Sequence, residues 1–211
     1  MKLLLIRHGE SVGNLEGRMQ GQSDSPLTDR GRDQARALLA RLQGEGWKPA
    51  VIYSSDLCRA AETADILAAG LGAPITLEGR LREYDIGMLS GVIWREVEVL
   101  YPELWRKLQQ RDESSVIPGE EGLAAFHERL SSMAGDILSA HQQGETVAVV
   151  AHGGSLGMIL VYLLHLAPRR PLPFRFDNTS LSVVDVGPRG TRLTLVNCTC
   201  HLNDGVVPVV E

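Results

Sequence analysis

Two histidines and two arginines follow short apolar runs in this sequence, at points where a buried strand would end. Arg7-His8 follow the first run, Arg59 comes shortly after the second, and His152 directly follows a run rich in valine and alanine. Guanidinium groups are permanently charged planar forks that match phosphate oxygens. A neutral imidazole can attack phosphorus and hold a phosphoryl group covalently. These residue types therefore favour phosphoryl chemistry on a small anionic substrate.

Two other interpretations use the same stretches of sequence. Gly153-Gly154-Ser155-Leu156-Gly157 matches the G-x-S-x-G pattern of serine hydrolases, and Ser155 could pair with Asp185 and His201 in the required chain order. That hypothesis leaves the two arginines without a role. A metal site at the two strand-end histidines is disfavoured, because no zinc-ligand spacing is present and the neighbouring arginines would repel a cation. We therefore expect no bound metal.

The strand and helix patterns that must position these residues alternate along the chain. Buried strands are predicted at residues 2–6, 50–54, 75–77 and 146–151, and an edge hairpin at residues 180–186 and 191–196. Helices with apolar stripes are predicted at residues 28–44, 57–70, 121–141 and 156–166. This order predicts an α/β fold, with a mostly parallel sheet, helices on both faces, an antiparallel edge hairpin and a small helical insert at roughly residues 84–120 over the active site. Residues 1–211 would form a single domain.

Ligands of such sheets bind outside the carboxyl ends of the strands. Arg7-His8, Arg59 and His152 are therefore expected to meet at one edge of the sheet. The glycines that follow each histidine permit tight turns and let backbone N–H groups approach an anion. Both features favour the same phosphate site.

Composition argues against several other classes of protein. The 211 residues carry 21 Lys+Arg against 26 Asp+Glu, and the formal net charge of −5 argues against a nucleic-acid partner. No apolar run approaches the ~20 residues that span a bilayer, so no membrane partner is expected, and the first run is too short for an export signal. The three cysteines form no CxxC pair, which favours a reduced, cytoplasmic protein. The edge hairpin could pair with a second copy to give a homodimer.

Several blocks of this sequence resemble the histidine phosphatase superfamily, in its phosphoglycerate mutase-like branch. A lone Arg-His-Gly-Glu would be a weak match, but the blocks together are specific and span most of the chain in the expected order. They are Leu5-Ile6-Arg7-His8-Gly9-Glu10-Ser11 with Asn14, Arg18-Met19-Gln20-Gly21, Asp24-Ser25-Pro26-Leu27-Thr28, Ser54-Ser55-Asp56-Leu57-Cys58-Arg59-Ala60, Leu81-Arg82-Glu83 and Ala151-His152-Gly153.

The resemblance implies a role for each matching residue. His8 would be the nucleophile that accepts the phosphoryl group, with its Nδ1 proton held by a backbone carbonyl. Glu83 would protonate the leaving oxygen and later activate water, although Glu10, Glu62 and Asp85 compete for that role on sequence alone. The other implied site residues, which would surround the phosphoryl oxygens, are Arg7, Arg59, His152, Ser11, Asn14, Gln20, Gly21 and Gly153. Neither a metal nor an organic cofactor is implied.

The resemblance favours a metal-independent phosphomonoester hydrolase that acts on a small phosphorylated metabolite through a phosphohistidine. A cofactor-dependent phosphoglycerate mutase is the alternative, but mutases of the family carry a longer insert with an Arg-Arg pair, where this chain has only Arg106-Lys107. A non-catalytic phospho-ligand binder is disfavoured because the complete catalytic set is present. Departures from the family pattern at Met88-Leu89-Ser90 and Glu120-Glu121-Gly122 lie in or beside the insert. They leave the substrate open, and glucosyl-phosphoglycerate, a cobalamin-precursor phosphate or several small phosphoesters fit equally well.

Overall fold

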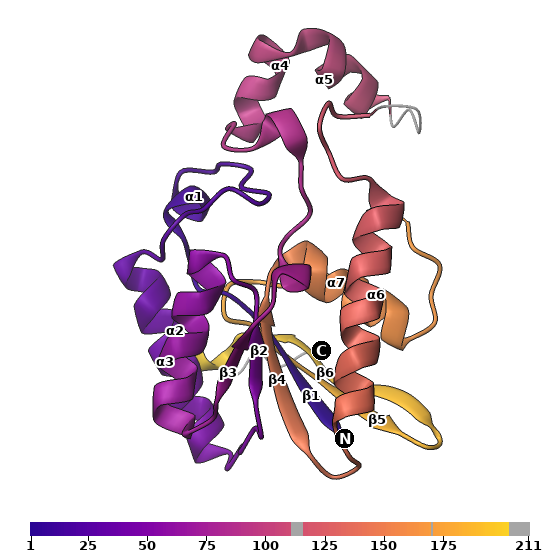
Figure 1. Cartoon of the computed structure of the whole chain (residues 1–211). Helices are drawn as coiled ribbons and strands as arrows, with labels where there is room; N and C mark the ends of the chain where they lie inside the picture. Colours follow the sequence, from indigo (N-terminus) through magenta and orange to yellow (C-terminus); the bar gives the residue numbers. More distant parts are fainter. Residues whose placement is uncertain (111–115, 170, 203–211) are drawn as a thin grey trace, which may run out of the picture.

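A six-stranded sheet forms the centre of the computed structural model, which describes residues 1–110, 116–169 and 171–202 (Figure 1). The strand order is β3-β2-β4-β1-β5-β6, with parallel pairing from β3 to β1 and antiparallel pairing at β5 and β6. This confirms the predicted α/β fold with an antiparallel edge hairpin. The strands are β1 (Lys2–Arg7), β2 (Ile52–Ser54), β3 (Ile75–Leu77), β4 (Thr146–Ala151), β5 (Leu181–Gly187) and β6 (Gly190–Cys198).

The central strands β1 and β4 are buried on both faces, as their unbroken apolar sequences predict. Alternate residues of β1 enter different cores: Leu3 and Leu5 pack in one hydrophobic cluster, and Leu4 and Ile6 pack in the other. The parallel register of β1 and β4 pairs Arg7 with Ala151. It therefore brings the residues that follow the two strands to the same height at the carboxyl edge of the sheet.

Two pairs of helices cover the two faces of the sheet (Figure 1). On one side lie α2 (Asp29–Gly44) and α3 (Cys58–Leu71), and on the other α6 (Leu123–Ala140) and α7 (Gly153–Leu163). The Thr28 hydroxyl accepts a hydrogen bond from the Gly31 N–H and so caps α2, as the sequence predicts. None of the helices in the described parts of the chain is long and apolar enough to cross a membrane.

The helices differ from the sequence prediction in two places. The last long helix, α7, begins at Gly153 and not at residue 156, because His152 has extended backbone angles and serves as its N-cap. The glycines there start the helix and do not form a separate turn. A short helix, α1 (Val12–Leu15), was not predicted, and it starts at Ser11 with a capping box formed by Ser11 and Asn14.

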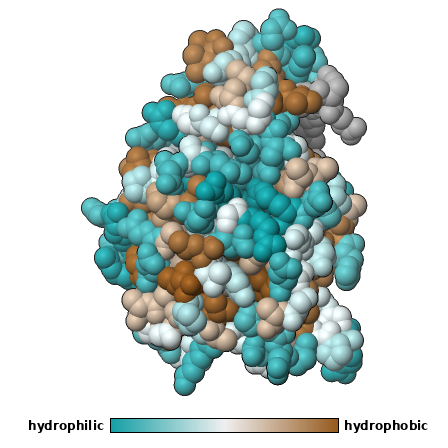
Figure 2. All heavy atoms as spheres, viewed as in Figure 1, coloured by the Kyte–Doolittle hydropathy of each residue, from teal (hydrophilic) through white to brown (hydrophobic). Residues whose placement is uncertain are grey.

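The predicted insert contains α4 (Val97–Leu100) and α5 (Pro102–Gln109), and residues 111–115 of it lie outside the described residues. Figure 1 shows these helices at the top, beyond the carboxyl edge of the sheet. Exposed apolar side chains such as Val99 and Leu100 lie here, and Figure 2 shows hydrophobic residues at this end of the molecule. The base of the insert contacts the loop after α1, through a β-bridge between Arg18 and Ile93.

Candidate active site

The carboxyl edge of the sheet holds a cavity of about 250 Å³. Its lining contains every predicted site residue except Ser11, and one residue that was not predicted, Arg18. The insert was predicted to lie over the active site. None of its described residues lines this cavity. Figure 2 shows strongly hydrophilic residues across the middle of this face, below the insert. The lining residues are Arg7, His8, Asn14, Arg18, Gln20, Gly21, Arg59, Glu83, His152 and Gly153.

His8 is buried, and its ring is fixed in one orientation. Its Nδ1 lies 2.7 Å from the Gly9 carbonyl oxygen, which can only accept a hydrogen bond, so Nδ1 carries the proton. The neutral ring then has its lone pair on Nε2. The close packing of this turn depends on glycine, because a Cβ on Gly9 would lie 2.5 Å from the Gly31 carbonyl oxygen. The loop thus presents His8 in the tautomer that a nucleophile requires.

Three more cationic or polar side chains surround His8. The Arg59 guanidinium donates to the carbonyl oxygens of Ser23 and Gly21 at 2.8 and 2.9 Å, and Arg7 donates to the Phe176 carbonyl oxygen at 2.6 Å. These bonds hold the two arginines in place. Within the described residues, the buried Nε atoms of both arginines and the buried Nδ1 of His152 have no hydrogen-bond partner. Buried donors without partners are costly, and an anion would satisfy them.

The positive surroundings also set the protonation of the two histidines. Burial, followed by the charges of Arg7 and Arg59, lowers the pKa of His8 well below its usual value. Burial and neighbouring positive groups lower the pKa of His152 in the same direction. The two rings lie 5.1 Å apart, and the Ser55 hydroxyl lies 2.9 Å from His152 Nε2. Both rings are therefore neutral at pH 7, as nucleophilic attack by His8 requires.

We expect the NMR signals of the His8 and His152 rings to stay unchanged from pH 8 down to about 6, whereas a histidine in a peptide titrates near pH 6.5. The measurement is the ¹³Cε1–¹H spectrum of [¹³C]histidine-labelled protein, with assignments from His8→Ala and His152→Ala. The unfolded chain binds more protons at these positions below about pH 6.5, so the free energy of unfolding should fall as the pH drops below that value. Rings that titrate at the peptide value would contradict the electrostatic account of the site.

Ser11 is the one predicted site residue that lies outside the cavity lining. It is fully buried, and its hydroxyl lies 3.0 Å from Asn14 Oδ1 and 2.9 Å from Gln20 Oε1. Asn14 Oδ1 also accepts from the Ser11 N–H and from Asn178 Nδ2, so the amide nitrogen of Asn14 is the end available to an anion. Ser11 therefore positions the neighbouring amides and does not itself line the cavity.

Arg18 was missed as a site residue, although it belongs to the Arg18-Met19-Gln20-Gly21 block that carries the resemblance. Its side chain is about half exposed at the rim of the cavity. Its Nε pairs with Glu16 at 2.5 Å and its Nη1 donates to the Gly91 carbonyl oxygen at 2.8 Å. Arg18 therefore also ties the rim of the cavity to the base of the insert.

The structure distinguishes among the four acids that compete in the sequence. Glu10 bonds to Thr28, Glu62 pairs with Arg32 at 2.6 Å, and Asp85 accepts from the Gly87 N–H. Only Glu83 among these acids lines the cavity. Its two carboxylate oxygens accept hydrogen bonds from the N–H groups of Tyr84 and Gly154 at 2.8 and 2.9 Å. The second bond anchors the carboxylate to the first turn of α7.

The Gly154→Ala variant is expected to lose about 10²-fold in kcat while it keeps its fold. A Cβ at this position would lie 2.3 Å from Glu83 Oε1, so the carboxylate must move. Alanine suits a helix better than glycine, by up to about 1 kcal/mol, so the melting temperature should not fall for that reason. The measurement is kcat together with thermal unfolding.

A matched control is Gly44→Ala, because a Cβ on Gly44 meets no atom within 4 Å. This control should leave kcat unchanged. Full activity of Gly154→Ala would show that the placement of the Glu83 carboxylate is not critical.

The alternative serine-hydrolase triad is not assembled. Ser155 is buried, and its hydroxyl donates to the Arg82 carbonyl oxygen at 2.8 Å. Asp185 pairs with Lys2 at 2.9 Å at the amino end of β1, and His201 Nε2 lies 3.1 Å from the Thr179 hydroxyl. The G-x-S-x-G match therefore reflects the start of α7 and not a nucleophile.

A larger depression of about 440 Å³ lies at the opposite end of the sheet, around the β5–β6 turn. The Lys2–Asp185 ion pair lies in its wall, and the depression contains none of the predicted site residues. We therefore place the candidate active site at the carboxyl edge.

Comparison with known proteins agrees with this assignment. Residues 3–199 match the family model described as histidine phosphatase superfamily (branch 1). Phosphoserine phosphatase 1 of Hydrogenobacter thermophilus is 34% identical over 204 residues, which cover 97% of this chain and 95% of that protein. The "Probable phosphoglycerate mutase GpmB" of Yersinia enterocolitica is 37% identical over 188 residues, which cover 88% of this chain and 85% of that protein. The crystal structure of the α-ribazole phosphatase from Shigella flexneri superposes with a TM-score of 0.84 at 26% identity, covering 94% of this chain and 97% of that one.

The chain belongs to the histidine phosphatase superfamily. The relatives named as phosphatases support a phosphatase, and so does the cavity, whose lining includes all five predicted catalytic residues. The relative that bears a mutase name shows that the family match alone does not separate the two activities.

Proposed function

We propose that this protein is a metal-independent phosphomonoester hydrolase that acts on a small phosphorylated metabolite through a phosphohistidine at His8. One observation carries the proposal: the neutral, oriented His8 ring lies in a cavity that also holds the buried Arg59, the half-buried Arg7 and the Glu83 carboxyl group. Two guanidinium groups balance the charge of a phosphoryl dianion.

In the first half of the reaction, His8 Nε2 attacks phosphorus and the bond to the substrate oxygen breaks. Glu83 gives a proton to the leaving oxygen, which departs as an alcohol. The charge on the phosphoryl oxygens is met by Arg7, Arg59 and His152, which are held in place before the reaction begins. The products of this half are the free alcohol and a phosphoryl group on His8.

In the second half, Glu83 accepts a proton from a water molecule, and the water oxygen attacks phosphorus. The phosphorus–nitrogen bond breaks, and inorganic phosphate leaves. The His8 ring returns to its neutral tautomer, with Nδ1 still bonded to the Gly9 carbonyl oxygen. No step requires a metal ion.

A phosphoglycerate mutase is the second candidate, because one relative bears that name. A mutase must hold its substrate while the phosphoryl group returns to it. The basic pair that could help, Arg106-Lys107, lies on α5 in the insert, and the Arg106 side chain is 62% exposed and faces Glu103. Neither residue lines the cavity. The hydrolase is therefore favoured.

A panel of phosphorylated metabolites tests the proposal, with kcat/KM measured in EDTA and inorganic phosphate as the product. Phosphoserine, α-ribazole phosphate, glucosyl-phosphoglycerate and 3-phosphoglycerate form the core of the panel. The expected result is unchanged hydrolysis in EDTA with a preference for one substrate. Activity that vanishes in EDTA and returns with a divalent cation would overturn the metal-independent mechanism. Formation of 2-phosphoglycerate from 3-phosphoglycerate and a bisphosphorylated primer, faster than phosphate release, would favour the mutase.

A further inference from the structure

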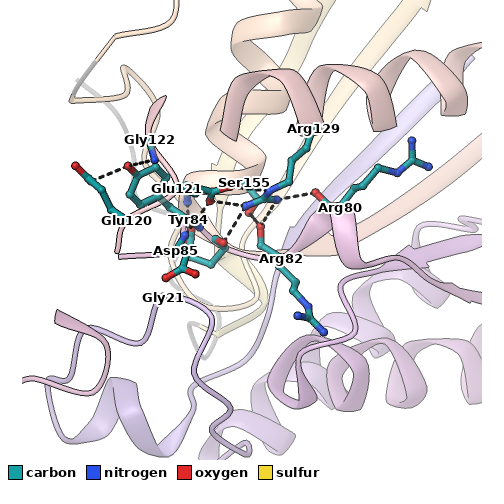
Figure 3. Close-up of polar contacts among 12 residues, drawn as sticks. Gly21, Arg80, Arg82, Tyr84, Asp85, Glu120, Glu121, Gly122, Arg129 and Ser155 are labelled. Carbon is teal, nitrogen blue, oxygen red and sulfur yellow. Dashed lines mark hydrogen bonds and ion pairs between the residues drawn. The ribbon is translucent and has the colours of Figure 1, made fainter. Parts of the chain in front are cut away.

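Arg129, on α6, uses every N–H donor that an arginine has. Its Nη1 donates to the carbonyl oxygens of Arg80 and Arg82, both at 2.8 Å, and its Nη2 donates to the Glu83 carbonyl oxygen at 3.0 Å. The remaining two donors form a fork on Glu121, at 2.7 and 3.0 Å. Figure 3 shows the guanidinium at the centre of these contacts. Its side chain is only 19% exposed, so the bonds are shielded from water.

The three carbonyl groups belong to the short segment of residues 80–83, which carries Glu83 into the cavity. This segment leaves the 3₁₀ turn η1 (Gly79–Leu81) and continues as a loop, so no helix or sheet ladder satisfies its carbonyl groups. Buried backbone groups must be paired, and here one side chain pairs three of them. The conformation of the loop therefore depends on Arg129.

The opposite side of the same segment is held by α7. The Ser155 hydroxyl donates to the Arg82 carbonyl oxygen, and the Gly154 N–H donates to the Glu83 carboxylate. The backbone of the segment is thus bound from both α6 and α7, and the Glu83 carboxylate is bound from α7. Two helices that pack against each other define where the carboxylate lies.

Glu121 binds the Arg129 guanidinium and helps to hold it in this structural role. Its two oxygens take two of the five donors, and its negative charge offsets that of the guanidinium. Glu121 Oε1 also accepts from the Asp85 N–H at 2.8 Å, and the Glu121 N–H donates to the Asp85 carbonyl oxygen at 3.1 Å. The segment at residues 120–122, which departs from the family pattern, therefore locks the loop just after Glu83.

We propose that Arg129 is a positioning residue that holds the Glu83 carboxyl group at the leaving oxygen of the substrate. The inference rests on the proposed function, in which Glu83 is the general acid. Arg129 does not line the cavity and acts only through the backbone that it binds.

Leaving-group dependence separates this role from a general contribution to stability. Nitrophenolate is a stable anion and leaves without a proton, whereas an alkoxide leaves slowly unless an acid protonates it. A misplaced Glu83 should therefore slow the hydrolysis of alkyl phosphates much more than the hydrolysis of p-nitrophenyl phosphate. A merely less stable protein would lose activity on both substrates equally.

The test compares kcat/KM of Arg129→Met for p-nitrophenyl phosphate and for an alkyl phosphate, at a temperature where thermal unfolding shows a folded protein. This ratio reports the steps up to formation of the phosphohistidine, in which Glu83 acts as the acid, and leaves out the later hydrolysis that both substrates share. We expect a loss of about 10²-fold on the alkyl phosphate and less than about 5-fold on p-nitrophenyl phosphate. Arg80→Met is the matched control, because Arg80 joins the same segment to α6 through Asp136, at 2.7 Å, without binding the three carbonyl groups. The control should lose little activity on either substrate.

Equal losses on both substrates, or no loss, would overturn the inference. If Arg129→Met does not fold, Arg129→Lys takes its place in the same comparison, because lysine keeps the charge but cannot reach three carbonyl oxygens at once.

Glu83→Gln, measured on the same two substrates, separates a failure of the proposed function from a failure of the inference about Arg129. If Glu83→Gln itself shows no leaving-group dependence, the acid assignment in the proposed function fails. If Glu83→Gln shows it and the Arg129 variant does not, only the inference about Arg129 fails.

Discussion

Replacing His8 with alanine is expected to lower kcat for phosphomonoesters on the order of 10⁴-fold or more. The alanine methyl group has no lone pair to attack phosphorus, and Arg7, Arg59 and His152 can then only bind the substrate. The variant should therefore still bind a phosphorylated ligand, and calorimetric titration with inorganic phosphate should show it. The measurement is kcat by phosphate release together with that titration.

The control for this experiment is His127→Ala, which removes a half-buried histidine from α6, outside the cavity lining. It should keep kcat within about 2-fold of the parent, as surface substitutions usually do. An active His8→Ala protein, with a loss below about 10-fold, would mean that another group attacks phosphorus.

Glu83→Gln is expected to lower kcat for alkyl phosphates by about 10²–10⁴-fold, because the amide cannot give a proton to the leaving oxygen. Glutamine has nearly the same shape, so KM should change little. The loss should be much smaller for p-nitrophenyl phosphate in the step that forms the phosphohistidine. Burst kinetics would isolate that step.

The matched control is Glu62→Gln. Glu62 also accepts a backbone N–H, from Leu27, and pairs with Arg32, but it does not line the cavity. This control should cost some stability and leave kcat unchanged. Equal losses in kcat for the two variants would show that charge near the site, and not proton transfer by Glu83, explains the effect.

Much of the fold could be predicted because its strands carry strong local signals. β3 and β4 have the predicted limits, and the central strands were recognised because burial on both faces demands unbroken apolar runs. The errors lie where tertiary structure overrides local preference. Glycine is typical of turns, yet Gly153 and Gly154 begin α7. At Gly154 the tertiary structure requires glycine, because its N–H binds the Glu83 carboxylate and a Cβ there would lie 2.3 Å from Glu83 Oε1.

The cavity could be predicted from strand-end positions, because the parallel register aligns the ends of β1 and β4. The choice of Glu83 needed the family resemblance, since nothing local distinguishes it from Glu10, Glu62 or Asp85. No pattern in the sequence indicated a role for Arg129. Its role comes from three carbonyl groups on a loop about 46 residues away in the chain, and only the tertiary structure brings them together.

The overall charge is a poor guide to the ligand of this protein. The formal net charge of −5 describes the surface, whereas Arg7 and Arg59 make the cavity locally cationic. The buried position of Arg59, 1% exposed, concentrates its field on a ligand because little water screens it.

The central claim is that His8 carries the phosphoryl group during turnover. It is tested most directly by quenching the reaction within one turnover, with a ³²P-labelled substrate in excess, and by mapping the label on the protein. The account predicts a label that is stable in base and labile in acid, located on the peptide that contains His8 and absent from His8→Ala. Label on a serine, or hydrolysis without label at any quench time, would contradict it.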